Sequence, residues 1–141
     1  MISYTDSLVH ISTGNLGGFF VGWPNPPSPE IHLKLLENSE QVVVALDEET
    51  GKAVGFITAI SDGVLSAYIP LLEVLPAYRG KGIGQELLQR ILAKLSGLYM
   101  VDLICDPEVQ PLYERLGMKK ATGMMLRNYE NQSGESGERP D

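Results

Sequence analysis

Two cationic side chains lie among three glycines just past the middle of the chain. In "YRGKGIG", Arg79 and Lys81 alternate with Gly80, Gly82 and Gly84, where an apolar run ends and a helical pattern begins. The dipole of a helix favours anions at its N-terminus, so two cations there are unfavourable unless an anion binds between them. Glycines let such an anion approach bare backbone N–H groups. The spacing therefore predicts a loop that binds a pyrophosphate, whereas a plain structural turn would account for the glycines but not for the cations.

Two established nucleotide motifs fit this loop poorly. The dinucleotide fingerprint GxGxxG needs a third glycine where Gln85 stands, and a strand immediately before the loop in place of Pro76-Ala77-Tyr78. The phosphate loop GxxxxGK needs Ser or Thr after its lysine, but Gly82 follows Lys81. A nicotinamide-nucleotide site therefore remains only as an alternative, which binding of NAD would support.

The length and composition fit one globular domain. The chain has 141 residues, of which 43% are hydrophobic, and these values predict a single domain over residues 1–130. Residues 131–141 are polar, contain glycine and lack large apolar groups, which predicts a disordered C-terminal tail. The single cysteine, Cys105, excludes an internal disulfide, and two scattered histidines give no metal-binding spacing. We therefore expect no bound metal.

The charge distribution limits the classes of partner. A net charge of −7 argues against nucleic acid. Residues 1–62 carry eight acids and two lysines, whereas residues 63–130 carry seven acids and eight bases. This asymmetry fits a cationic ligand near the first half and an anionic one at the second, or an ordinary acidic surface. No apolar stretch approaches the length of a membrane span and the first residues resemble no signal peptide, so we expect a cytoplasmic protein with no membrane partner.

The first half of the chain predicts helices and an antiparallel meander. Ile2 to Thr5 predicts a short strand and Ser12 to Val21 a weak, glycine-interrupted helix. A helix from Pro29 to Asn38 is indicated because Ser28 can cap it and proline suits the first helical position. Three strand-like runs follow, with a turn at Asp62-Gly63: "QVVVALD", "AVGFITAI" and "LSAYIPLLEVL".

From Gly82 the apolar period becomes that of a helix, which Gly97 ends. The next strand is "YMVDLIC", so a strand–helix–strand crossover places its two strands parallel. Asp106 can cap a further helix that ends at Gly117, and "MKKATGMMLRNY" predicts a closing strand. The predicted fold class is α+β: a mixed sheet with an antiparallel meander, one parallel strand–helix–strand junction and helices on both faces.

Two motifs of the chain resemble those of a known family. "VLPAYRGKGIG" resembles the acetyl-CoA signature of the GCN5-related N-acetyltransferase (GNAT) family, which has Arg or Gln, two residues, Gly, one residue, then Gly or Ala. "PLYERLGM" resembles the family's terminal Leu-Tyr-Glu-Lys-Leu-Gly-Phe. The resemblance covers Val42 to Asn128 and implies an acetyl-CoA-dependent N-acetyltransferase. Such an enzyme would transfer acetyl to a primary amine of a small molecule or peptide by direct attack in a ternary complex.

The resemblance also implies where coenzyme A binds. Backbone amides of the glycine loop would hold its pyrophosphate: Arg79, Gly80, Lys81, Gly82, Ile83 and Gly84. Its pantetheine would lie beside the fourth strand, with main-chain contacts from Leu72, Val74 and Leu75. In the family a β-bulge splays the fourth and fifth strands, and Pro70 is compatible with such a break. Family members often place an Asn that contacts the cofactor where Asp106 stands, so Asp106 departs from the pattern and also suits a helix cap.

Two residues are candidates for the chemistry. Tyr113 occupies the family's general-acid position, where a phenol can donate to the leaving sulfur; the alternative is a tyrosine half-buried at a helix interface. Glu73 is the only acid in an otherwise apolar strand, which makes it the candidate base. Alternatively Glu73 points away from the cleft, and a water chain or another residue takes the proton. Cys105 ends a strand and is better interpreted as a core residue than as a nucleophile.

The acceptor contacts are predicted upstream of the meander. Phe19, Phe20 and Trp23 could line the acceptor site or pack in the core. The family resemblance also makes a homodimer possible, since many relatives dimerise. A coenzyme-A-binding sensor or regulatory domain without turnover is the alternative function, and the presence of Tyr113 argues against it.

Overall fold

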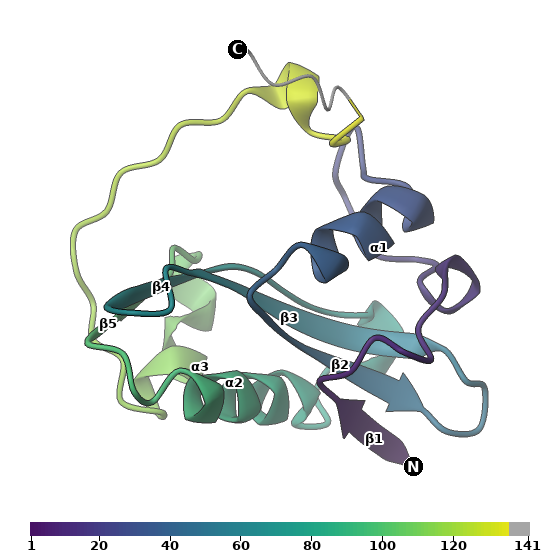
Figure 1. Cartoon of the computed structure of the whole chain (residues 1–141), viewed down its shortest axis with the longest axis horizontal. Helices are drawn as coiled ribbons and strands as arrows, with labels where there is room; N and C mark the ends of the chain where they lie inside the picture. Colours follow the sequence, from purple (N-terminus) through teal and green to yellow (C-terminus); the bar gives the residue numbers. More distant parts are fainter. Residues whose placement is uncertain (136–141) are drawn as a thin grey trace.

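The computed structural model describes residues 1–135 and contains one five-stranded sheet flanked by helices (Figure 1). The strands are β1 (Ile2–Thr5), β2 (Gln41–Asp47), β3 (Ala53–Ser61), β4 (Ser66–Val74) and β5 (Met100–Asp102). The helices are α1 (Pro29–Glu37), α2 (Ile83–Lys94) and α3 (Gln110–Glu114). The strands lie side by side in chain order.

The sheet is antiparallel except for its last pair of strands. Short connections join β2, β3 and β4, which pair antiparallel, and β1 also pairs antiparallel with β2. β5 pairs parallel with β4, and α2 supplies the crossover that a parallel pair requires. The predicted fold class is therefore confirmed, including the single parallel junction.

Helices cover both faces of the sheet (Figure 1). α2 buries one apolar stripe, formed by Ile83, Leu87, Leu88 and Ile91, against inward residues of β2, β3 and β4. α1 and the loop before it form a second cluster on the opposite face, around Leu36 and Phe56. Burying a Leu or Ile side chain contributes about 1.5–3 kcal/mol, so the α2 stripe fixes the start of this helix against the sheet.

The α1 boundaries agree with the capping signals in the sequence. The Ser28 hydroxyl accepts a hydrogen bond from the Ile31 amide at 3.2 Å, and Pro29 occupies the first helical position. Asn38 is the C-cap residue. The predicted helix is confirmed to within one residue.

The helix predicted from Ser12 to Val21 is wrong. Only a 3-10 turn, Thr13–Asn15, forms there, and the Asn15 side chain accepts from the Ser12 amide at 2.8 Å. Gly18 adopts φ 90°, which a helix cannot contain. Local side-chain bonding and glycine flexibility therefore outweigh the weak apolar period.

The closing strand predicted at residues 118–129 is also wrong for the part of the chain that the structure describes. This segment joins no strand ladder, and β5 pairs over three residues in place of the seven predicted. The Asp106 side chain makes no cap hydrogen bond, although Asp106 does precede a 3-10 turn, Pro107–Val109. Residues 136–141 of the predicted tail lie outside the described residues, so the domain limits at 130 and 131 stay a prediction.

His32 is a buried histidine whose environment predicts acid sensitivity. It is 1% exposed among Phe19, Phe20 and Phe56, and neither ring nitrogen has a hydrogen-bond partner among the described residues. Burial lowers the pKa of His32 from 6.5 to about 4. The folded state therefore favours the neutral ring, and its contribution to stability is present above pH 6.5 and lost as the pH falls toward 4.

We expect His32→Phe to remove this acid sensitivity. Between pH 6.5 and about 4, the free energy of unfolding of the wild type should fall relative to that of the variant by about 1.4 kcal/mol per pH unit. Urea unfolding at several pH values measures this difference. A difference that is constant with pH would contradict the assignment, whatever its size at neutral pH.

Candidate active site

β4 has an open edge that begins at a β-bulge. Thr58 pairs with Leu71 but Ile60 pairs with Tyr68, so Ile69 and Pro70 together oppose one residue of β3. On the other side, β4 pairs with β5 only through residues 66–68. The two strands therefore separate just where the bulge lies, and residues 69–74 of β4 have no strand neighbour on that side in the described chain. This confirms a break at Pro70.

The bulge also determines which main-chain groups face the open edge. The Leu75 amide donates to the Val54 carbonyl at 2.8 Å, which makes this a hydrogen-bonded pair of the β3–β4 ladder. Because such pairs alternate with non-hydrogen-bonded ones, Leu72 and Val74 direct their N–H and C=O groups away from β3. Leu72 is placed to contact a ligand strand through both groups, and Val74 through its N–H, because the Val74 carbonyl already accepts from Arg79. Leu75 is not, because its amide is bound to Val54, so the main-chain contact predicted for Leu75 needs correction.

The glycine loop joins this open edge to the start of α2. Gly80 and Gly82 have φ of 79° and 82°, a left-handed conformation in which a Cβ is unfavourable. Gly82 is the N-cap of α2 and has no side chain to bind the first amides of the helix. The N–H groups at the start of this helix therefore point outward without an intrahelical partner, as an anion-binding site requires.

The two cations of the loop are held by neighbouring groups. The Arg79 Nε donates to the Val74 carbonyl at 2.9 Å, which leaves its terminal nitrogens available. The Lys81 ammonium lies 5.4 Å from the centre of the Tyr78 ring, and the Tyr78 hydroxyl donates to Asp47 at 2.6 Å. These contacts keep two positive charges beside the amides of α2, so the residues present fit a pyrophosphate.

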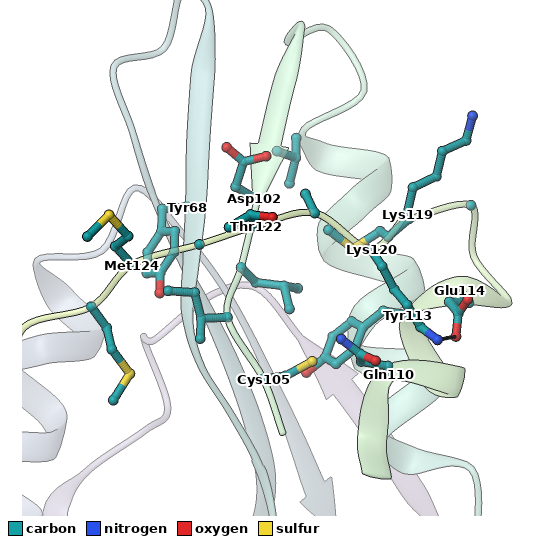
Figure 2. A pocket seen from close by; sticks show the side chains of 18 of the residues that line it. Tyr68, Asp102, Cys105, Gln110, Tyr113, Glu114, Lys119, Lys120, Thr122 and Met124 are labelled. Atoms are coloured by element: carbon teal, nitrogen blue, oxygen red, sulfur yellow. Dashed lines mark ion pairs between the residues drawn. The ribbon is translucent and has the colours of Figure 1, made fainter. Parts of the chain in front are cut away.

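Tyr113 lies close to the same junction. A Cβ on Gly84 would be 3.8 Å from Val74 and 3.9 Å from Leu112, so β4, α2 and α3 meet at Gly84. Tyr113 follows Leu112 on α3 and lines a cavity of about 850 Å³ with Cys105 and Gln110 (Figure 2). Burial raises the pKa of the Tyr113 phenol to about 12, with a smaller contribution from Cys105. The phenol is therefore protonated at neutral pH, as a donor must be.

Cys105 and Asp106 lie in the connection between β5 and α3. Burial raises the pKa of the Cys105 thiol, and the charge of Asp106 adds to this effect. A raised pKa disfavours the thiolate, which agrees with the prediction that Cys105 is no nucleophile. Asp106 is exposed, so its side chain is free to reach a ligand, and its cofactor contact stays a prediction.

Glu73 binds the loop that precedes α1. Its carboxylate accepts from the Phe20 amide at 2.8 and 3.0 Å and from the Val21 amide at 3.3 Å. Phe20 has φ of 63°, which costs about 1–2 kcal/mol for a residue other than glycine. Hydrogen bonds to a charged acceptor can offset that cost. Glu73 therefore anchors a strained loop, and its role as a base stays a prediction.

Comparing two substitutions separates the anchor from the base. We expect Glu73→Gln, which keeps an acceptor oxygen but cannot take up a proton, to retain kcat within about threefold. We expect Glu73→Ala to lower the free energy of unfolding by about 2 kcal/mol, because the amides of the Phe20 loop lose their acceptor. Steady-state kinetics and urea unfolding provide the measurements. A loss of about 100-fold in kcat for a stably folded Glu73→Gln would instead identify the base.

The predicted acceptor residues do not share one environment. Phe19 and Phe20 are 8% and 3% exposed and pack on His32 and Phe56, so their rings belong to the core. Trp23 is 37% exposed and lines a second cavity of about 390 Å³ with Arg127, Asn128, Tyr129 and Gln132. Of the three, only Trp23 presents surface to a ligand.

Two contacts of the site were missed by sequence reasoning. Asp47 holds Tyr78, and the Phe20 amide holds Glu73, across 31 and 53 residues of chain. No local pattern indicates such pairs. One local feature does indicate a contact. Tyr78 stands in the sequence directly before the two cations, and its ring lies beside the Lys81 ammonium.

An open strand edge that leads to an amide-lined helix start defines a site for an extended ligand that carries an anionic group. A sequence model of the acetyltransferase (GNAT) family matches residues 8–118, and the chain therefore belongs to this family. The confirmed resemblance supports the interpretation of the glycine loop as the family's signature.

Solved structures and curated relatives agree with this assignment. A crystal structure of a Deinococcus radiodurans R1 protein assigned as an acetyltransferase is 48% identical, with a TM-score of 0.90 over 94% of this chain and 92% of that one. A GNAT family acetyltransferase of Streptococcus pneumoniae is 27% identical, with a TM-score of 0.73 over 91% and 98%. Rice serotonin N-acetyltransferase 2 is 31% identical over 69% of this chain and 50% of its own length. The chain spans 50–59% of the length of the first curated relatives that it matches.

Proposed function

We propose that this protein is an acetyl-CoA-dependent N-acetyltransferase that acetylates a primary amine of a small molecule or peptide by direct attack in a ternary complex. The observation that supports it most strongly is the edge of β4 that has no strand neighbour among residues 1–135, with Leu72 and Val74 directed outward and the glycine loop leading from it to the start of α2. An extended pantetheine chain matches such an edge as an added strand would. Family membership and relatives named as N-acetyltransferases support the same proposal.

Different residues bind the cofactor and take part in the chemistry. Acetyl-CoA supplies a thioester, whose acetyl group forms a bond to the amine nitrogen while the bond to sulfur breaks. The amides from Gly80 to Gly84 and the charges of Arg79 and Lys81 hold the pyrophosphate. A free N–H of β4 polarises the thioester carbonyl as negative charge develops on its oxygen. Tyr113 donates a hydrogen bond to the departing sulfur.

The leaving thiolate must gain a proton and the attacking amine must lose one. A thiol has a reference pKa near ~8.5, well below the pKa of about 12 for Tyr113, so the phenol stabilises the thiolate by hydrogen bonding and solvent finally supplies its proton. An alkylamine has a reference pKa near ~10.4 and must lose a proton to attack. That proton passes to water or to a base in the acceptor site.

We propose that the acceptor approaches from the α1 side of the sheet. Residues 1–62 carry eight acids against two lysines, a net charge of −6, and Trp23 is an exposed aromatic group of this region. A cation next to an aromatic face is favourable, so an amine that carries an aromatic or cationic group fits best. The rice relative is named for an arylalkylamine, which makes this class the first to test.

A thiol-release assay with acetyl-CoA and a panel of amines tests the proposal. The panel contains arylalkylamines, polyamines, aminoglycosides and lysine peptides, and each acceptor and the donor are also measured alone. We expect thiol release only with donor and acceptor together, and mass spectrometry should find the acetylated amine. Acetyl-CoA binding by calorimetry without release for any acceptor would favour the sensor alternative. Binding of NAD without acetyl-CoA would overturn both.

The location of the protein is a separate question. Among residues 1–135, no helix has the length and apolar character that crossing a bilayer requires. A cytoplasmic location stays a proposal, and two relatives from Oryza sativa and Arabidopsis thaliana are named as chloroplastic.

A further inference from the structure

A second cavity, of about 390 Å³ and named here the Trp23 cavity, lies between the loop before α1 and the 3-10 turn Tyr129–Asn131. Figure 1 shows this turn, in yellow, beside the chain that leads into α1. The volume is within the range of small-molecule sites. Its lining comes from both ends of the chain: Trp23, Arg127, Asn128, Tyr129 and Gln132.

Tertiary contacts set the shape of the Trp23 cavity. The Asn25 amide donates to the Gln132 side chain at 2.9 Å, which joins residues 107 positions apart. A Cβ on Gly134 would lie only 2.9 Å from Ile31, so the backbone after the turn packs closely against α1. These contacts hold the two walls of the cavity together, although the walls lie at opposite ends of the described chain.

The Trp23 cavity is close to the open edge of β4. The Phe20 amide donates to the Glu73 carboxylate at 2.8 Å, and the ring centres of Phe20 and Trp23 are 4.9 Å apart. The Trp23 amide also donates to the Phe20 carbonyl at 3.2 Å, a turn that keeps these two residues within about 7 Å of each other. Glu73 lies between Leu72 and Val74, which face the open edge. A small molecule that enters the cavity can therefore also reach this edge.

The lining of the Trp23 cavity has one cation and, among the described residues, no acid. This is unusual for a chain with 18 acidic residues and 11 basic ones. The Arg127 guanidinium forms no ion pair with the described residues, and its Nη1 donates to the Leu126 carbonyl at 3.3 Å. Its other N–H groups suit an oxyanion, which can bind a guanidinium through two parallel hydrogen bonds.

The neutral side chains of the lining indicate the rest of the ligand. The Trp23 and Tyr129 residues are 37% and 60% exposed, and aromatic rings of this kind pack favourably on another ring. The carboxamides of Asn128 and Gln132 can donate N–H groups to an oxyanion. One guanidinium balances one negative charge, which matches a carboxylate better than a phosphate of about −1.5 to −2. The lining thus fits an aryl group that bears a carboxylate.

We propose that the Trp23 cavity binds the far end of the acceptor, and that this end is an aromatic ring with a carboxylate. Arg127 and Trp23 then determine which amines are acetylated. The amine at the other end of the molecule lies toward Glu73 and the open edge of β4. The acceptor role rests on the proposed acetyl transfer, whereas binding of an aryl carboxylate to the cavity does not.

Fluorescence tests the binding step without any reaction, because Trp23 is the only tryptophan of the chain. The two ligands are para-(aminoethyl)benzoate and phenylethylamine, which has the same ring and amine without the carboxylate. We expect the wild type to bind the carboxylate at least ~10-fold more tightly, since it gains a hydrogen bond between charged groups. Arg127→Gln should abolish this preference. Arg115→Gln should keep it, because Arg115 is exposed at the end of α3 and does not line the cavity.

Thiol release with the same two amines tests the acceptor role. We expect kcat/KM to favour the carboxylate at least ~10-fold in the wild type and in Arg115→Gln, and to lose this preference in Arg127→Gln. Equal affinities of the wild type for the two amines, or a preference that Arg127→Gln retains, would overturn the proposal. Release with other amines would then still support the acetyl transfer. A carboxylate preference in fluorescence, without release from any amine, would instead reject the acetyl transfer and with it the acceptor role.

Discussion

Tyr113→Phe is expected to lower kcat about 100-fold while KM for acetyl-CoA changes less than about twofold. The substitution removes one oxygen from a half-buried ring that packs beside the α2 cluster, so the ring keeps its place. What is lost is the donor to the sulfur, an interaction made as the thiolate develops. An interaction of that kind lowers kcat and kcat/KM together. Stopped-time thiol release at saturating donor measures the effect.

The tyrosine at position 68 provides the control for Tyr113. Tyr68 lines the same cavity from β4, and Tyr68→Phe also removes one hydroxyl group (Figure 2). We expect this variant to keep kcat within about twofold. Because the pKa of Tyr113 is about 12, the ratio of wild-type to Tyr113→Phe activity should stay constant from roughly pH 6 to 10. A Tyr113→Phe enzyme as active as Tyr68→Phe would show that the phenol is structural.

The parts of the fold that the sequence predicts are those with a local signal. The amphipathic period of α2 and the alternating runs of β2 to β4 report burial on one face of each element, and the structure has that burial. The glycines of the loop predict bare backbone N–H groups that an anion can approach, and the structure adds that Gly80 and Gly82 adopt a left-handed backbone. The family motif alone indicates Tyr113, because no local pattern shows that its ring lines a cavity with Cys105 and Tyr68.

The failures of prediction have a common physical origin in long-range pairing. Glu73 was selected as a lone acid in an apolar strand, and such an acid needs a partner. Its partners are backbone amides of Phe20 and Val21, and no side-chain pattern marks a backbone donor. The predicted closing strand failed for a related reason: β propensity describes residues 118–129, but a strand also needs a neighbouring strand to pair with, and these residues join no ladder among residues 1–135.

Gly82→Ala is expected to raise KM for acetyl-CoA about 10-fold with kcat within about twofold of the wild type. At φ of 82° an alanine costs about 1–2 kcal/mol, so the loop relaxes toward another conformation and its amides turn from the pyrophosphate. A hydrogen bond to a charged group contributes about 1.5–3 kcal/mol, and losing one of them is enough for the change. No described protein atom lies within 4 Å of the added Cβ, so a clash inside the chain cannot be the cause.

Gly63→Ala separates donor binding from backbone strain. Gly63 has φ of 73° in the turn between β3 and β4, at the opposite end of β4 from the loop, and its Cβ would also meet nothing within 4 Å. Both variants should therefore lose similar stability in urea unfolding, whereas only Gly82→Ala should lose affinity for acetyl-CoA by calorimetry. Equal affinities for the two variants would mean that the conformation of Gly82 does not form the donor site. Backbone strain from an alanine is common to both positions, because both glycines have positive φ. If the two variants are equally stable and only Gly82→Ala loses affinity, the left-handed conformation of Gly82 therefore serves phosphate binding.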